Sequence, residues 1–162
     1  MMRVGIGYDS HRFASGRPLI LGGIKIPHPL GLAGHSDADA VAHAVADAML
    51  GAAALGDIGR LFPDTDLAYK NADSMVLLAA VRNRLREHGW ALQQADVTVI
   101  AEAPRLAPHV AAMAARLAEV LGVVPGAMSI KAKTNEQMGF IGRGEGIAVM
   151  AVATIVALTP AG

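Results

Sequence analysis

The stretch from residue 37 to residue 55 constrains the fold more than any other part of this chain. It contains no proline and is dominated by alanine, the residue with the highest helix propensity, so it predicts a helix. We expect Ser36 to be the N-cap, with Asp39 three residues later completing a start that resembles a capping box. Apolar residues fill the remaining faces, which predicts a helix that is buried nearly all round within a larger domain.

The polar residues of this helix form a single stripe, because Asp39, His43 and Asp47 are spaced i, i+4 and i+8. Burying a polar group without a partner costs roughly 2–7 kcal/mol, and a charge costs more, so this stripe needs partners. Two interpretations are open at this point. The stripe is either an internal hydrogen-bond network that satisfies its own members, or it contains a metal-binding histidine oriented by carboxylates.

Composition narrows the class of protein. Of the 162 residues, 53% are hydrophobic and only 17% charged, and the mean hydropathy of +0.40 predicts apolar surface buried against other subunits. A formal net charge of +0 without a basic block argues against a nucleic-acid partner. There is no cysteine, which excludes disulfides and thiolate zinc sites and fits a cytoplasmic protein. The longest apolar stretch, residues 147–158, is too short to span a membrane.

Local periodicity predicts the other elements. Residues 3–9 alternate like a strand, and two apolar runs around the Gly22-Gly23 pair predict a hairpin within residues 19–27. Residues 56–66 are expected to form a loop. Apolar spacing and glycine stops predict helices at about 72–88 and 109–121, and strands at 96–103, 127–135 and 147–158. Helices that alternate with strands over one core predict a single domain of the α/β or α+β class.

Two groups of polar residues carry the chemistry. Asp9 and His11 lie on one face of the first strand and form, with His43, a set of two nitrogens and one oxygen that suits a catalytic zinc site with an open position. Residues 134–146 are rich in glycine, which lets backbone N–H groups approach phosphate oxygens, and Glu136 among them suits a hard cation such as Mg²⁺. The alternative is a collection of polar loop residues that share no ligand.

Four separated motifs resemble a known family. They are YDSH at 8–11, HSDADAVAHAVADAMLGAAALGDIGRLFPDTD at 35–66, AEAPRLAPH at 101–109 and KAKTNEQMGFIGRGEGIA at 131–148. They stand in the family's order and extend the resemblance through essentially the whole chain. The sequence is therefore similar to the 2-C-methyl-D-erythritol 2,4-cyclodiphosphate synthases, which act in the methylerythritol phosphate route to isoprenoids.

The resemblance implies an α+β fold of the ferredoxin-like sandwich type, in which a β-sheet carries helices on one face and a small β-hairpin is added. It implies a single cyclodiphosphate synthase domain over residues 1–162 and a homotrimer with active sites between subunits. The implied substrate is 4-diphosphocytidyl-2-C-methyl-D-erythritol 2-phosphate. Its 2-phosphate attacks the β-phosphorus, expels CMP and closes a cyclic diphosphate, a reaction that depends on positioning and charge neutralisation.

The resemblance also implies metal ligands. Asp9, His11 and His43 match the ligands of one Zn²⁺ per subunit. Glu136 matches the ligand of a second divalent cation, Mg²⁺ or Mn²⁺, that binds with the substrate diphosphate. Asp47 would then support the metal-binding helix from behind the ligands.

Further roles follow from the same resemblance. His35 and Thr134 match a pair that stabilises the transition state by hydrogen bonds. Other positions match segments that bind the methylerythritol phosphate, the cytidine and the diphosphate, or that line the subunit junction. The complete set of expected substrate-binding residues is Asp9, Ser10, His11, His35, Ser36, Asp57, Ile58, Gly59, Phe62, Pro63, Asp64, Thr65, Asp66, Ala101, Glu102, Ala103, Pro104, Arg105, Leu106, Ala107, Lys133, Thr134, Asn135, Glu136, Phe140 and Arg143.

Two other classes of function stay open. A zinc-dependent phosphohydrolase would use an activated water on a similar metal site and would release a linear phosphate rather than a cyclic diphosphate. A non-catalytic trimeric ligand-binding module would keep all its measured properties when its metal is removed.

Overall fold

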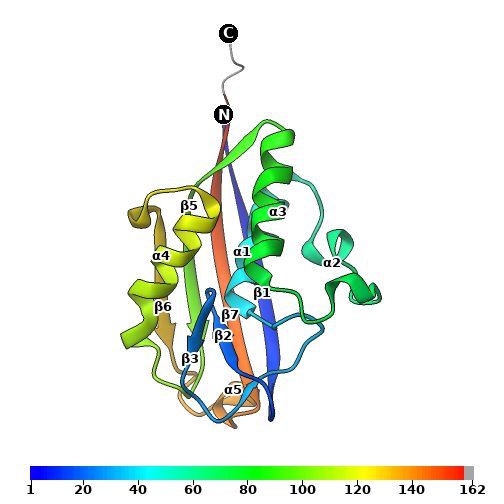
Figure 1. Ribbon diagram of the computed structural model, residues 1–162. Helices are drawn as coiled ribbons and strands as arrows, with labels where there is room; N and C mark the ends of the chain where they lie inside the picture. Colours follow the sequence, from blue (N-terminus) through cyan, green and yellow to red (C-terminus); the bar gives the residue numbers. More distant parts are fainter. Residues whose placement is uncertain (159–162) are drawn as a thin grey trace.

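A five-stranded sheet forms the centre of the computed structural model, which describes residues 1–158 (Figure 1). The strand order is β4–β1–β7–β5–β6; β7 pairs antiparallel with both β1 and β5, whereas β5 and β6 are parallel. The last four residues of the predicted domain, 159–162, lie outside the described residues. The strands are β1 (Met2–Ala14), β4 (Gly31–Leu32), β5 (Trp90–Ile100), β6 (Met128–Lys133) and β7 (Gly146–Ala157).

Helices cover one side of this sheet. Figure 1 shows α3 and α4 in front of the strands, together with the antiparallel pair β2 and β3, and α1 lies directly against β1 and β7. The mixed α+β class is therefore confirmed. These elements are α1 (Ala40–Ala53), α3 (Ser74–Glu87), α4 (Val110–Leu121), β2 (Leu19–Leu21) and β3 (Ile24–Ile26); the short helices are α2 (Ile58–Leu61), α5 (Gly139–Gly142) and the 3₁₀ turns η1 (Leu67–Tyr69), η2 (Ala107–His109) and η3 (Pro125–Ala127).

Several element boundaries differ from the predicted ones. The expected loop at 56–66 contains the helical turn α2, and the strand expected at 96–103 begins six residues earlier, at Trp90, and ends at Ile100. The strand expected at 127–135 ends at Lys133, before the polar segment that follows. The predicted helices at 72–88 and 109–121 and the strand at 147–158 are confirmed. None of the helices among the described residues is long and apolar enough to cross a bilayer.

The start of α1 corrects the prediction for Ser36. The N-cap is Asp39, whose buried carboxylate accepts hydrogen bonds from Ala42 N at 3.0 Å, Gly22 N at 2.9 Å and Gly23 N at 2.7 Å. The two glycines have positive φ in the tight turn between β2 and β3. Burial raises the pKa of Asp39 to about 6. The carboxylate of Asp39 therefore joins the hairpin to the start of α1.

Close packing of α1 on β1 explains the small residues of both elements. A Cβ atom at Gly7 would lie 1.9 Å from the carbonyl oxygen of Ala44, and one at Gly5 would lie 2.1 Å from that of Ala48. Only glycine on the strand facing alanine on the helix permits this approach. Asp9 continues the same face of β1, so the strand delivers its polar end to the N-terminal half of α1.

The opposite face of the sheet is apolar and exposed. Val4, Ile6 and Tyr8 of β1 are 61%, 64% and 54% exposed, and they pair with Thr154, Val152 and Met150 of β7, respectively. Val152 and Met150 are themselves 43% and 42% exposed. The apolar residues of β1 thus point away from the helices, since the inner face has room only for glycine. Apolar patches of this kind are uncommon on monomers.

Candidate metal centre and active site

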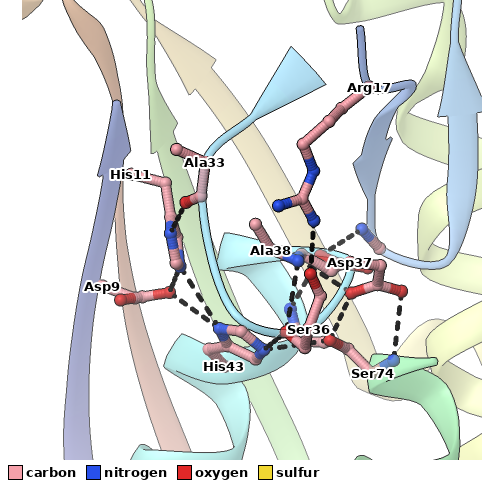
Figure 2. Close-up of polar contacts among 12 residues, drawn as sticks. Asp9, His11, Arg17, Ala33, Ser36, Asp37, Ala38, His43 and Ser74 are labelled. Carbon is pink, nitrogen blue, oxygen red and sulfur yellow. Dashed lines mark hydrogen bonds and ion pairs between the residues drawn. The ribbon is translucent and has the colours of Figure 1, made fainter. Parts of the chain in front are cut away.

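Three potential metal ligands converge between β1 and α1 (Figure 2). Nε2 of His11 lies 2.8 Å from Oδ2 of Asp9, and Nδ1 of His43 lies 3.1 Å from the same oxygen. The two ring nitrogens are 3.4 Å apart. All three donor atoms lie within 4.8 Å of one another, so one small cation between them would contact all three.

The donor set fits a divalent cation of the zinc type. Two imidazole nitrogens and one carboxylate oxygen leave a fourth tetrahedral position open, as in catalytic zinc sites. His11 is already oriented for ligation, because its Nδ1 lies 2.7 Å from the carbonyl oxygen of Ala33. Donation from Nδ1–H to that carbonyl leaves the lone pair on Nε2, which faces Asp9.

The charges of the ligands depend on one another. Burial alone would raise the pKa of Asp9, but the adjacent imidazoles of His11 and His43 together outweigh burial and hold that pKa below its usual value. Burial alone would lower the pKa of His11, but the hydrogen bond and the negative charge of Asp9, together with the carbonyl of Ala33, outweigh burial and raise it. A proton and a cation would therefore compete for the same atoms of Asp9 and His11.

The ligands open onto a cavity of about 270 Å³. His11 and His43 form part of its wall, and the other predicted residues in the wall are His35, Ser36, Ile58, Gly59, Phe62 and Asp64. The structure thus brings the metal ligands together with the segment that was predicted to bind the methylerythritol phosphate. Sequence reasoning missed three wall residues, Gly34, Tyr69 and Leu77. The rings of Tyr69 and Phe62 pack edge-on with their centroids 5.2 Å apart, and Leu77 is a buried residue of α3.

Several acidic residues of this region bind the backbone instead of the cavity. Asp47 accepts a hydrogen bond from Ile58 N at 2.7 Å, so it holds the start of α2 against α1, and burial raises its pKa. Asp47 thus supports α1 through a link to the neighbouring loop. Asp57 and Asp66 cap α2 and η1, and the ring of His35 donates to the carbonyl oxygen of Asp66 at 2.9 Å.

A second cavity, of about 280 Å³, lies at the ends of β5 and β6. It is lined by residues that were predicted to bind cytidine and diphosphate, namely Ala101, Glu102, Pro104, Arg105, Leu106, Ala107, Lys133 and Thr134. Glu102 accepts hydrogen bonds from Asn135 N at 3.0 Å and Gln137 N at 3.1 Å. Its carboxylate therefore holds the turn that carries Glu136, whose φ is +50°.

The predicted catalytic pair is divided between the two cavities. His35 lines the cavity at the metal ligands, and Thr134 lines the one at β5 and β6, where its Oγ1 lies 3.5 Å from Oε1 of Glu136. Phe140 lines a third hollow with Ser10, and Arg143 pairs with Glu145 at 3.1 Å on the surface. One chain thus carries two groups of predicted site residues on separate surfaces.

A family model and several known proteins match this chain. The model of the YgbB family matches residues 2–156. A relative from Dechloromonas aromatica, named 2-C-methyl-D-erythritol 2,4-cyclodiphosphate synthase, is 58% identical over 94% of this chain and 96% of its own.

Solved structures share the fold. The bifunctional IspDF from Campylobacter jejuni superposes with a TM-score of 0.94 at 43% identity, over 98% of this chain and 43% of that one. A 2C-methyl-D-erythritol-2,4-cyclodiphosphate synthase in a CDP-bound form superposes with a TM-score of 0.87 at 37% identity, over 95% of this chain and 100% of that one. The chain therefore belongs to the YgbB family, the family of the 2-C-methyl-D-erythritol 2,4-cyclodiphosphate synthases.

Proposed function

We propose that this chain converts 4-diphosphocytidyl-2-C-methyl-D-erythritol 2-phosphate into 2-C-methyl-D-erythritol 2,4-cyclodiphosphate and CMP. An oxygen of the 2-phosphate forms a bond to the β-phosphorus, and the bond from that phosphorus to the oxygen bridging it to the α-phosphate breaks. The electron pair leaves with CMP, so no water is consumed. The observation that carries the proposal is the convergence of Asp9, His11 and His43 beside a cavity, in a chain of this family.

The metal centre in this proposal holds one Zn²⁺ on Asp9, His11 and His43. When bound, the cation supplies Lewis-acid polarisation of a phosphate oxygen. Glu136, on its turn beside Thr134, contributes a carboxylate to a second divalent cation, Mg²⁺ or Mn²⁺, that arrives with the diphosphate. His35 and Thr134 donate hydrogen bonds to the charge that develops on the transferred phosphoryl group.

The cavity at β5 and β6 is the proposed nucleotide site. Most residues of the segment 101–107 line it, and their backbone groups would present donors and acceptors to a base edge. Lys133 at its edge supplies positive charge toward a diphosphate. The CDP bound to a structural relative supports a cytidine nucleotide as the ligand class.

We infer further that the active protein is a homotrimer with sites between subunits. The exposed apolar face of β1 and β7 needs a partner surface, and a second copy of the chain offers the same apolar chemistry. His35 and Thr134 line separate cavities within one chain, so a site that uses both is more readily built from two chains. A cytoplasmic location stays a prediction.

Incubation with the diphosphocytidyl substrate tests the proposed reaction. Phosphorus NMR should show loss of the substrate signals and equimolar formation of a cyclic diphosphate and CMP, both abolished by metal removal. A linear phosphate product would indicate the phosphohydrolase instead. Tight binding of the substrate without turnover, unaffected by chelation, would indicate the binding module.

A further inference from the structure

Behind His43, on the side away from Asp9, lies a chain of hydrogen bonds that the proposed reaction does not use. Nε2 of His43 lies 2.9 Å from Oγ of Ser74, and that hydroxyl is hydrogen-bonded to Asp37 (Figure 2). Ser74 is the first residue of α3 and is only 1% exposed, so water does not compete for its hydroxyl. Asp37 comes from the loop that precedes α1, so the chain joins three segments.

The direction of these hydrogen bonds follows from the chemistry of the groups. An ionised carboxylate only accepts hydrogen bonds, so the hydroxyl proton of Ser74 points to Asp37. The backbone N–H of Ser74 donates to the other oxygen of Asp37 at 3.1 Å, which fixes the carboxylate in place. With its proton so directed, the oxygen of Ser74 faces His43 as an acceptor, and Nε2 of His43 must carry the hydrogen.

A neutral imidazole with hydrogen on Nε2 has its free lone pair on Nδ1. In His43, Nδ1 is the nitrogen that lies 3.1 Å from Asp9 and 3.4 Å from Nε2 of His11. We propose that Asp37 and Ser74 are positioning residues that hold His43 in the Nε2–H tautomer and keep Nδ1 available for a cation. This inference rests on the proposed metal centre for its consequence, but the tautomer itself is a property of the chain alone.

The two histidines are thus held in opposite tautomers. The carbonyl of Ala33 takes the hydrogen on Nδ1 of His11, whereas Ser74 takes the hydrogen on Nε2 of His43. Opposite tautomers are needed because one ring projects from a strand and the other from a helix, and different nitrogens reach the shared point. Oγ of Ser36, at 3.3 Å from Nε2 of His43, is a more distant second acceptor.

Two substitutions interrupt the chain in different ways. Ser74→Ala removes the acceptor of the Nε2 hydrogen. Asp37→Asn provides an NH₂ group that can donate to Ser74, so that the serine can in turn donate to Nε2 and favour the wrong tautomer of His43. Asp73→Asn is the matched control, since Asp73 caps the same helix by accepting from Met75 N at 2.8 Å and asparagine caps equally well.

Zinc affinity, measured by competition with a chromophoric chelator, should fall by about 10–100-fold in Ser74→Ala and Asp37→Asn, the range found when partners of metal ligands are lost. Asp73→Asn removes the same charge from the same helix end and should stay within about twofold, a difference of some 0.4 kcal/mol. Unchanged affinity in the first two variants, or an equal loss in all three, would overturn the proposal.

Nitrogen-15 NMR of the metal-free, unsubstituted protein reads the tautomer directly. We expect Nε2 of His43 to carry hydrogen, facing Ser74, and a bare Nε2 would refute the inference even if a variant fails to fold. Failure of the unsubstituted protein to bind zinc would refute the proposed metal centre but not the tautomer. The two failures are therefore distinguishable.

Discussion

Replacing Glu102 by alanine removes the side chain that joins the proposed nucleotide cavity to the proposed second cation site. Its Oε1 accepts from Asn135 N at 3.0 Å and from Gln137 N at 3.1 Å. Between these amides, Glu136 and Gln137 have φ of +50° and +61°, in the left-handed region that side chains disfavour. The carboxylate therefore stabilises a turn conformation that is unfavourable for the backbone alone.

The effect of Glu102→Ala on the population of the turn follows from these contacts. Two hydrogen bonds to a charged acceptor contribute about 3–6 kcal/mol before solvent exposure is discounted. Two left-handed residues cost about 2–4 kcal/mol. Without Glu102, its hydrogen bonds no longer offset the cost of the two left-handed residues. Even one uncompensated left-handed residue lowers the population of the turn about tenfold. Glu136 would then occupy this position for a smaller fraction of the time.

Calorimetry with CDP and Mg²⁺ measures this effect. Glu102→Ala should weaken binding at least about tenfold, whereas Glu102→Gln keeps an acceptor oxygen and should lose less. Zinc content, which would depend on the proposed ligands Asp9, His11 and His43 beside the other cavity, should be unchanged and serves as the internal control. Retention of full CDP affinity in Glu102→Ala, with unchanged hydrogen-exchange protection of the Asn135 amide, would refute the reasoning.

Three further predictions concern the metal and the base. His43→Ala should remain folded but lose its zinc, and a variant that retains stoichiometric zinc by elemental analysis would contradict the ligand assignment. Zinc affinity should fall as the pH is lowered, because the raised pKa of His11 lets protons compete for Nε2 at higher pH than for an ordinary histidine; chelator competition at several pH values measures this, and a flat profile would argue against it. CMP should bind more tightly than UMP, because the segment 101–107 presents fixed backbone donors and acceptors, and equal affinities by calorimetry would remove the case for base recognition.

Much of the fold could be predicted because its signals are local. The alanine-rich stretch forms a helix, and strand alternation places Asp9 and His11 on the face of β1 that meets it. The direction of that face was less evident, because Gly5 and Gly7 rather than the apolar residues face the core. Because α1 lies so close to β1, the glycines of the strand face inward and its apolar residues face outward, which reverses the usual pattern of a strand. Only the packed structure reveals this reversal.

The partners of the ligands could not be predicted from spacing. Asp39 was placed in a polar helical stripe, yet its three hydrogen bonds cap α1 and fix the turn between β2 and β3. Ser74 and Asp37 reach His43 only because the start of α3 packs on the loop before α1. Such contacts depend on how distant segments meet, which no local pattern encodes.

Subunit exchange between two inactive variants tests the shared, metal-dependent site most directly. His43→Ala lacks the proposed zinc half, and Glu136→Ala lacks the half that binds the second cation. If neighbouring chains each contribute one half, random exchange restores about a quarter of the sites to two intact halves, and cyclic diphosphate formation should recover to about that fraction. Mixed oligomers verified by mass spectrometry that stay as inactive as their parents would contradict a site shared between chains.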